Sequence, residues 1–427
     1  KPEDVEPTIA NWYASTFVDG GEYASILVKT REGRPIKIEG NKASSVSKGA
    51  LSARAQASVL SLYDNEKLKG PQAAGKATDW NQLDKEFTAK LAEVAAKGGQ
   101  IRIVSNTILS PTTKKVIADF AAKYPTTQHI TYDANPAYGL TQAHGGVLPN
   151  IDFSQAKTIV SVGADFLSTW LLPTEFAVQY GMGRNPEADW MSKHFQFESI
   201  LSVTGSNADV RGMIKPSEEA AVLAYMIKAL GGNPGTAANA GSWKAAADKA
   251  VAALKKSKKE SIVVAGSNNI GIQQLANQLN NMLGAYGSTI DLNTTINLHQ
   301  SQDAQALKLA ADVAAGKGPE VLIMMGVNPV YSMPNGAAFA KGLKSITTVA
   351  ISSFEDETAS NCTYVCPDHH QLENWTDHMA KSNEYAVGQP TIRPLHNTAS
   401  VVESLLVWAG NAKRGGKDSK VAYDYIK

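Results

Sequence analysis

Apolar and polar residues alternate near the beginning of the chain, which is the pattern of β-strands. Residues 25–41, SILVKTREGRPIKIEGN, keep this alternation on both sides of Glu32-Gly33. A short polar turn that contains glycine suits the connection between two antiparallel strands. The pattern therefore predicts a β-hairpin in this part of the chain.

After Gly70-Pro71 the pattern changes to short apolar strands that alternate with amphipathic helices. We expect helices at 79–96, where Asp79 can cap the first turn, from Ser110-Pro111 to about 123, at 216–230 and at 271–283. The expected buried strands are 101–105, 158–165, 261–267, 320–326 and 347–353. Apolar strands separated by helices form parallel sheets covered on both faces, so the predicted fold class is α/β.

The segments that follow the expected strands carry the first candidate chemistry. GADFLSTW, AGSNNIG, MGVNPVY and ISSFEDETAS are all rich in Gly, Asn, Asp and Ser. Ligands bind at the carboxyl ends of parallel strands, so these loops are either the rim of a dinucleotide-sized crevice or ordinary turns. Neither a GxGxxG motif nor a P-loop occurs, and the common NAD and ATP fingerprints are therefore absent.

Composition narrows the function classes. The chain has 427 residues, of which 43% are hydrophobic and 19% charged, and its net charge is +1. That length supports more than one domain, and the balanced charge gives no field that would favour nucleic acid or an anionic membrane. No apolar run approaches the roughly 18 residues of a transmembrane helix. We expect no nucleic-acid partner and no membrane-spanning helix in these residues.

The stretch NCTYVCPDHHQLENWTDH, residues 361–378, holds the only two cysteines of the chain and looks at first like a metal site. On a strand at about 3.3 Å per residue, Cys362 and Cys366 lie roughly 13 Å apart, too far for a disulfide. Cys366 and His369 are near the spacing of a zinc-ligand pair, but no second pair follows. We therefore expect no metal here and a core position for Cys366.

Several motifs, in the same order and at similar spacing, resemble molybdopterin oxidoreductases. They are GRPIKIEGN, SKGALSARAQASVLSLYDNEKLKGP, VSVGADFLSTWLLPTEF, GVNPVYSMP and SSFEDETASNCTYVCPDHHQLENWTDH. The resemblance covers nearly the whole chain. It implies a small β-rich N-terminal region at 1–75, a discontinuous Rossmann-like domain at 76–136 and 259–427, and an inserted parallel-sheet domain at 137–258.

The departures from that family concern its metals. Family members bind a [4Fe–4S] cluster through four cysteines near the N-terminus, where this chain has Glu22, Ala24, Ser25 and Ser52, with Arg54 close to a family lysine. Such side chains cannot replace thiolates on iron. The protein ligand to molybdenum is not identifiable either; Thr141 and His144 are the nearest polar candidates, and a core or loop role suits them better.

Within the family, the chain resembles the cofactor-free amino-terminal half of the large iron–sulfur subunit of alternative complex III, a membrane-bound quinol oxidoreductase. The resemblance implies a non-catalytic structural role, with no catalytic, cofactor or metal residue in this segment. It implies a ferredoxin-like domain beyond residue 427 with [3Fe–4S] and [4Fe–4S] clusters. It also implies a multiheme cytochrome c and integral membrane quinol-binding subunits as partners, on the periplasmic side of the inner membrane.

The resemblance also implies a vestigial crevice where relatives hold the pterin. Its expected residues are Asp165, Asn328, Asp356, Asp368, His370 and Glu373. We expect Asp368, His370, Glu373 and Asp377 to form one hydrogen-bonded network, because buried polar groups need partners. Asp356 and Glu357 are better explained as a loop cap and former ribose contacts than as a catalytic carboxylate pair.

Two other functions stay open. The chain could be an active molybdopterin-dependent reductase of the polysulfide or thiosulfate type. It could also be a binding module whose crevice holds a different nucleotide.

Overall fold

The computed structural model describes residues 7–427, and its N-terminal part is an antiparallel sheet. Strands β1 (Ala10–Asp19), β2 (Glu22–Arg31) and β3 (Arg34–Gly40) pair in chain order. Glu32 and Gly33 both have positive φ, as a two-residue hairpin turn requires, which confirms the predicted hairpin. Helix α1 (Ala53–Leu62) covers this sheet and buries Leu62 against it.

The larger sheet has seven strands in the order β5-β4-β16-β15-β14-β6-β7. Its parallel strands are β6 (Ile101–Ser105), β7 (Thr127–Thr131), β14 (Val321–Met325), β15 (Thr347–Ser352) and β16 (Tyr364–Pro367), and the short β4 (Gln72–Ala73) and β5 (Lys76–Ala77) extend one edge. Strands β6 and β14 are neighbours in the sheet. In sequence they are separated by a second, smaller lobe that has its own parallel sheet, described below. The strand order reverses at this pair, which makes it the topological switch point.

Helices cover both faces of this sheet, as the apolar strands predict. One face packs against α2 (Trp80–Ala96), α3 (Pro111–Lys123) and α13 (Val401–Trp408), and the other against α10 (Asp303–Ala314) and α12 (Gly336–Leu343). Asp79 accepts a hydrogen bond from the Gln82 N–H at 3.0 Å, and Ser110 accepts one from the Thr113 N–H at 2.8 Å. These contacts confirm both predicted helix starts.

The smaller lobe contains a four-stranded parallel sheet in the order β11-β10-β9-β12. The strands are β9 (Thr158–Val162), β10 (Lys193–Glu198), β11 (Val210–Met213) and β12 (Ser261–Ala265); the helices around them include α5 (Pro173–Met182), α7 (Glu219–Ala229), α8 (Lys244–Ser257) and α9 (Ile270–Leu283). Because β12 pairs directly with β9, it belongs to this lobe. The expected boundary at 259 put it with the larger sheet, and the pairing corrects that assignment.

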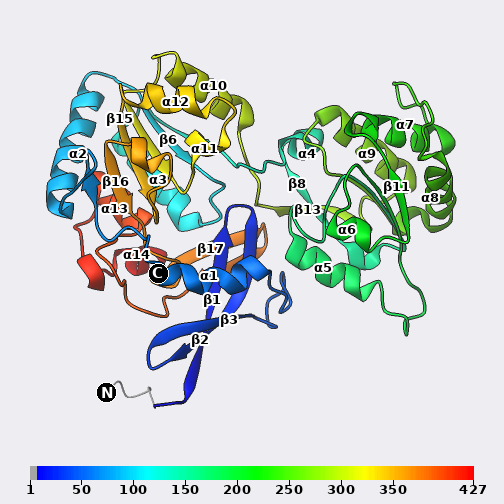
Figure 1. Cartoon of the computed structure of the whole chain (residues 1–427), viewed down its shortest axis with the longest axis horizontal. Coiled ribbons are helices and arrows are strands. Elements are labelled where there is room, and N and C mark those ends of the chain that lie inside the picture. The colour runs from blue at the N-terminus through cyan, green and yellow to red at the C-terminus, as the bar shows by residue number, and fades with distance from the viewer. Residues whose placement is uncertain (1–6) are drawn as a thin grey trace.

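A second antiparallel sheet, in the order β18-β17-β13-β8, joins the lobes. It consists of β8 (Leu148–Ile151), β13 (Ile290–Ile296), β17 (Thr376–Lys381) and β18 (Glu384–Gly388), and in Figure 1 β8 and β13 lie between the lobes. The shorter elements are α4 (Tyr138–Ala143), α6 (Val203–Ser206), α11 (Pro329–Ser332), α14 (Val421–Ile426) and 3-10 turns at 153–155, 216–218, 258–260, 359–361 and 416–418.

Within residues 7–427, no helix has both the length and the apolar character that a bilayer crossing requires. The predicted α/β class with parallel sheets and a small β-rich N-terminal region is confirmed.

Candidate functional site

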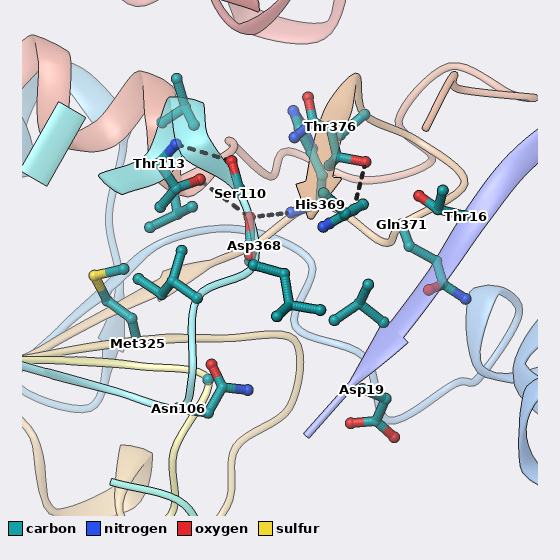
Figure 2. A pocket seen from close by; sticks show the side chains of 18 of the residues that line it. Thr16, Asp19, Asn106, Ser110, Thr113, Met325, Asp368, His369, Gln371 and Thr376 are labelled. Atoms are coloured by element: carbon teal, nitrogen blue, oxygen red, sulfur yellow. Dashed lines mark hydrogen bonds between the residues drawn. The ribbon is translucent and has the colours of Figure 1, made fainter. Parts of the chain in front are cut away.

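A large cavity lies at the switch point of the larger sheet, and we call it the main crevice. It has a volume of about 540 Å³ and lies where β6, β14, β15 and β16 end, next to Asn106, Gly326, Phe354 and Asp368. Strand β1 and helix α1 close its opposite side. In Figure 2, Thr16, Asp19 and Gln371 face Ser110, Thr113 and Asp368 across the open space. The crevice is therefore in the position where a doubly wound sheet binds a ligand.

Neutral polar groups and apolar side chains form most of its wall. The neutral polar side chains are Thr16, Ser58, Ser61, Ser105, Asn106, Thr107, Ser110, Thr112, Thr113, Ser353, Gln371, Asn374 and Thr376. The ionisable ones are Asp19, Asp368 and Asp377, with His369, His370 and His378. Over the described range 7–427, no lysine or arginine lines this crevice.

Asp377, at the start of β17, is bound to the N-terminus of α3. Its carboxylate accepts hydrogen bonds from the Ser110 hydroxyl, from the Thr112 N–H at 3.2 Å and from the Thr112 hydroxyl at 2.8 Å. The Tyr385 hydroxyl donates a further bond at 3.3 Å. A negative charge is stabilised here, because free N–H groups and the helix dipole both favour an anion.

Asp368, directly after β16, accepts a hydrogen bond from the N-terminus of α13, as Asp377 does from α3. One carboxylate oxygen accepts from the His369 N–H at 2.8 Å and from the Val401 N–H, the first residue of the helix, at 3.2 Å. Burial raises the pKa of Asp368 to about 7. The two backbone hydrogen bonds lower this pKa, but their effect is smaller than that of burial.

The three histidines of the wall are held in their neutral form. Burial lowers the pKa of His369, His370 and His378 to about 4 in each case. His369 is hydrogen-bonded to Thr398 at 2.6 Å and His378 to Thr376 at 3.1 Å. The crevice therefore contains no histidine cation to balance its carboxylates near neutral pH.

Ser61 and His370 approach each other as a nucleophile and a base would, at 2.9 Å. The Leu372 N–H donates to Nδ1 of His370 at 3.2 Å, so the proton of the neutral ring lies on Nε2, facing Ser61. Ser61 donates its own proton to the Ser58 carbonyl at 2.7 Å. His370 in this form cannot take a proton from Ser61, which leaves the pair without nucleophilic chemistry.

The predicted hydrogen-bonded network of Asp368, His370, Glu373 and Asp377 is wrong in its extent. His370 and Glu373 do meet, because the His370 N–H donates to Glu373 at 2.9 Å. Glu373 also accepts from the Leu395 N–H at 2.8 Å and lies 3.5 Å from Nζ of Lys67, with both side chains buried. Asp368 and Asp377 are bound to different helices instead, because a helix N-terminus is a better partner for a carboxylate than another acid.

The structure also divides the six expected crevice residues. Asp368 and His370 line the main crevice, whereas Glu373 faces a neighbouring cavity of about 510 Å³. Asn328 donates to Glu357 at 2.6 Å, and Asp356 accepts from the Thr358 and Ala359 N–H groups at 3.0 and 2.8 Å. These contacts confirm the loop cap at Asp356, and neither Asn328 nor Asp356 lines those two cavities.

Asp165 lies at a second crevice, of about 120 Å³, where β9 and β12 end in the smaller lobe. It accepts from the Thr204 N–H at 3.0 Å and the Thr204 hydroxyl at 2.6 Å. A Cβ on Gly266 would lie 2.1 Å from the Gly163 carbonyl oxygen, so the two strand ends are in direct contact. This close approach keeps the second crevice small.

The two cysteines behave as separate apolar groups. Cys366 is fully buried in the core between the larger sheet and its helices, and burial raises its thiol pKa far above the usual range. Burial likewise raises the pKa of Cys362 to about 12. Across residues 7–427, no group of three or more His, Cys, Asp or Glu side chains converges as metal ligands would.

The positions where the family has cluster cysteines contain an ion pair and core residues. Arg54 donates to Glu22 at 2.9 and 3.1 Å and lies 3.4 Å from Asp19, while Ala24 is fully buried in the N-terminal sheet. Ser52 caps α1 by accepting from the Ala55 N–H at 3.0 Å. These side chains do not fit an iron–sulfur cluster, whose iron atoms need thiolate or imidazole ligands.

Thr141 and His144, the candidates nearest the molybdenum-ligand position, have structural partners. The Thr141 hydroxyl bonds the Ala137 carbonyl at 3.0 Å. His144 is bound to the Leu140 carbonyl at 3.0 Å and to the Tyr286 hydroxyl at 2.9 Å. The Thr141 hydroxyl and the His144 ring therefore have hydrogen-bond partners within the smaller lobe, and neither residue lines the main crevice.

The chain has a mixed α/β fold similar to that of molybdopterin oxidoreductases. The solved structure of acetylene hydratase from Pelobacter acetylenicus matches 91% of this chain and 68% of its own with a TM-score of 0.68, at 13% sequence identity. At that identity the likeness concerns the fold alone. No protein-family model matches the chain.

The particular relative found by sequence is the "menaquinone reductase, molybdopterin-binding-like subunit" of Nitratidesulfovibrio vulgaris (strain Hildenborough). The two are 24% identical over an alignment of 437 positions, which covers 90% of this chain. The chain spans 63% of the length of that relative.

The main crevice does not fit an anionic pterin dinucleotide. Such a cofactor carries a pyrophosphate, which proteins hold with helix N-termini, backbone N–H groups or cationic side chains. Here the two helix N-termini at the wall are bound to Asp377 and Asp368, and the wall supplies no lysine or arginine among residues 7–427. The wall therefore places carboxyl groups at the two helix N-termini where a phosphate group would otherwise find free N–H groups.

Sequence reasoning named Asp368, His370 and Asp377 and missed most of the wall. Asp377 and Ser110 are 267 residues apart, and their contact depends on how β17 packs beside α3. The one local signal was the Ser110-Pro111 helix start, which marks a helix N-terminus but not what faces it.

Proposed function

We propose that this chain is a non-catalytic structural part of a respiratory quinone oxidoreductase, of the alternative complex III type. The proposal is supported by the printed name of its relative, a molybdopterin-binding-like subunit of a menaquinone reductase, and by the shared fold. The role would be to hold electron-carrying partners at fixed distances, which a rigid two-lobed body can do.

The observation that carries the proposal is the Glu22–Arg54 ion pair beside the buried Ala24. Together they take the place where a catalytic relative would bind its cluster. Two guanidinium nitrogens of Arg54 donate to one oxygen of the largely buried Glu22 carboxylate, which connects α1 to the N-terminal sheet and leaves no thiolate donor there. In our proposal this segment binds no cofactor, and electrons pass through other parts of the assembly.

The proposed assembly extends beyond these residues. Since the matched relative is longer than the chain, we propose that a ferredoxin-like domain with [3Fe–4S] and [4Fe–4S] clusters forms part of the same polypeptide. The other proposed partners are a multiheme cytochrome c and integral membrane quinol-binding subunits. Binding to them would hold the chain at the periplasmic side of the inner membrane.

Affinity purification of the tagged full-length chain from detergent-solubilised membranes tests this assembly. We expect haem-containing and integral membrane subunits to co-purify in fixed ratio, and quinol oxidation to be present only in the complex. A chain that purifies alone from the soluble fraction, with reductase activity of its own, would contradict the proposal.

Two other functions stay open, an active molybdopterin-dependent reductase of the polysulfide or thiosulfate type and a module for another nucleotide, although the carboxyl groups at the wall of the main crevice disfavour an anionic ligand. The specific observation is a cavity of about 540 Å³ at the switch point, where such ligands bind. Mass spectrometry of small molecules released on denaturation separates the candidates: a pterin or nucleotide in stoichiometric amount would favour one of these two functions.

A further inference from the structure

Two helices begin at the wall of the main crevice. Helix α3 has 13 residues and starts after Ser110, and helix α13 has eight and starts after Ser400. Thr112, Thr113, Val401 and Val402, all in the first turns, line the cavity. A helix N-terminus attracts anions because its first N–H groups lack partners within the helix and the dipole is positive there.

Both positive helix ends are already bound to acidic side chains of the chain itself. The Asp377 carboxylate accepts from the backbone and hydroxyl of Thr112 and from the hydroxyl of Ser110. The Asp368 carboxylate accepts from the Val401 N–H at 3.2 Å. The two acids come from the two ends of one segment, the loop from β16 to β17, so a single stretch of chain serves both helices.

The other charges near the cavity do not reverse this balance. Asp19 adds a third carboxylate to the wall and is compensated by Arg54 at 3.4 Å. Lys67, the buried cation behind the wall, lies 3.5 Å from the Glu373 carboxylate. Histidine contributes no positive charge near neutral pH, as described above. A phosphate that entered the crevice would meet carboxylates at both helix N-termini.

We propose that the carboxyl groups of Asp377 and Asp368 occupy the two helix N-termini at the wall of the main crevice, where a phosphate group would otherwise bind, and so exclude anionic dinucleotides. The inference rests on the proposed function, because it explains how a fold that elsewhere binds a pterin dinucleotide can remain without one. In this inference the two acids determine which ligands the main crevice excludes. That role does not depend on contact with a partner subunit.

Removing the acids should convert the crevice into an anion site. In Asp377→Ala, the Thr112 N–H and the Ser110 hydroxyl lose their partner, so pyrophosphate can bind the end of α3. We expect the variant to unfold at a lower temperature than the wild type in chloride. Pyrophosphate at matched ionic strength should then raise its Tm by roughly 2 °C or more. The wild type should show no such rise.

The matched control is Asp356→Ala. Asp356 is also a carboxylate that caps backbone N–H groups after a strand of the larger sheet, but it does not line the main crevice. We expect this variant to lose stability and to gain nothing from pyrophosphate beyond the effect of chloride. An equal gain in Asp356→Ala and Asp377→Ala would show a non-specific salt effect and overturn the inference.

Direct binding gives a second readout. The ³¹P NMR signal of pyrophosphate should broaden in the presence of Asp377→Ala, and further with Asp368→Ala added, but not with the wild type. If Asp377→Ala does not fold in chloride, pyrophosphate should restore its refolding yield. Broadening by the wild type, or none with the variants, would contradict the inference. Co-purification with haem-containing and integral membrane subunits tests the proposed function separately, so the two failures are distinguishable.

Discussion

At the scale of single residues, the main crevice is a site where burial and hydrogen bonding set the charge. Asp377 keeps its carboxylate bound to a helix N-terminus, while burial raises the pKa of Asp368 to about 7. Burial lowers the pKa of His369, His370 and His378 to about 4. The shifted pKa values of Asp368 and of the three histidines act on stability in opposite directions, and the stability of the protein should therefore depend on pH.

The free energy of unfolding should fall as pH decreases from about 6.5 to about 4. The three buried histidines gain protons more readily in the unfolded chain, at roughly 1.4 kcal/mol per unit of pKa difference for each. Asp368 acts in the opposite direction, since its raised pKa makes the folded state more favourable as pH falls from about 7 towards about 4.

Asp368→Asn should therefore make the acid loss of stability steeper, because it removes the opposing contribution. Urea unfolding at several pH values between 4 and 8 measures this. An unchanged or shallower slope in the variant would mean that Asp368 does not titrate as described.

The buried thiol of Cys366 gives a second prediction at this scale. Cys366 packs in the main core of the larger sheet, so Cys366→Ser should lower the free energy of unfolding by about 1–3 kcal/mol, because it buries a hydroxyl without a partner. Cys366→Ala should cost less. In the native protein at pH 8, a thiol reagent should leave Cys366 unmodified until unfolding; rapid modification would contradict its burial.

At the scale of elements, the loop from β16 to β17 determines the character of the site. It supplies Asp368, His369, His370, Glu373 and, at its end, Asp377, and it connects helices α3 and α13 with the segment before β4. The Lys67–Glu373 pair fixes the middle of this loop. Both side chains are almost fully buried, and Nζ of Lys67 has no hydrogen-bond acceptor among the described residues.

Lys67→Met should destabilise the protein by about 3–5 kcal/mol, because it leaves the Glu373 carboxylate buried without its cation. Adding Glu373→Gln should recover part of that loss, since glutamine can still accept from the His370 and Leu395 N–H groups. A double-mutant cycle in chemical denaturation measures the coupling. Strictly additive losses would show that the two charges do not interact.

Sequence patterns predicted the elements with local signals and missed those made by distant pairing. The β2–β3 hairpin, the Asp79 and Ser110 caps and the apolar strands of both parallel sheets are all confirmed. The β17–β18 hairpin was not predicted, because Thr376–Lys381 is mostly polar and its strand pairs with Ile296 far away in sequence. For the same reason, the contacts of Asp377 and the Lys67–Glu373 pair followed from no local motif.

At the scale of the whole molecule, two lobes with parallel sheets are joined by the antiparallel sheet that contains β8, β13 and β17 (Figure 1). Lys381 on β17 donates to Asn150 at 2.7 Å and to Glu175 of α5 at 2.6 Å, so buried polar contacts as well as strands connect the lobes. In our proposal, this body retains the crevice of its fold class while the carboxyl groups at the crevice wall exclude anions.

The most direct test of this account is the molybdenum content of the full-length protein, purified from its native host and measured by mass spectrometry of the metal. The account predicts molybdenum far below one atom per chain, with no pterin released on denaturation. One molybdenum per chain, together with a pterin dinucleotide, would contradict it.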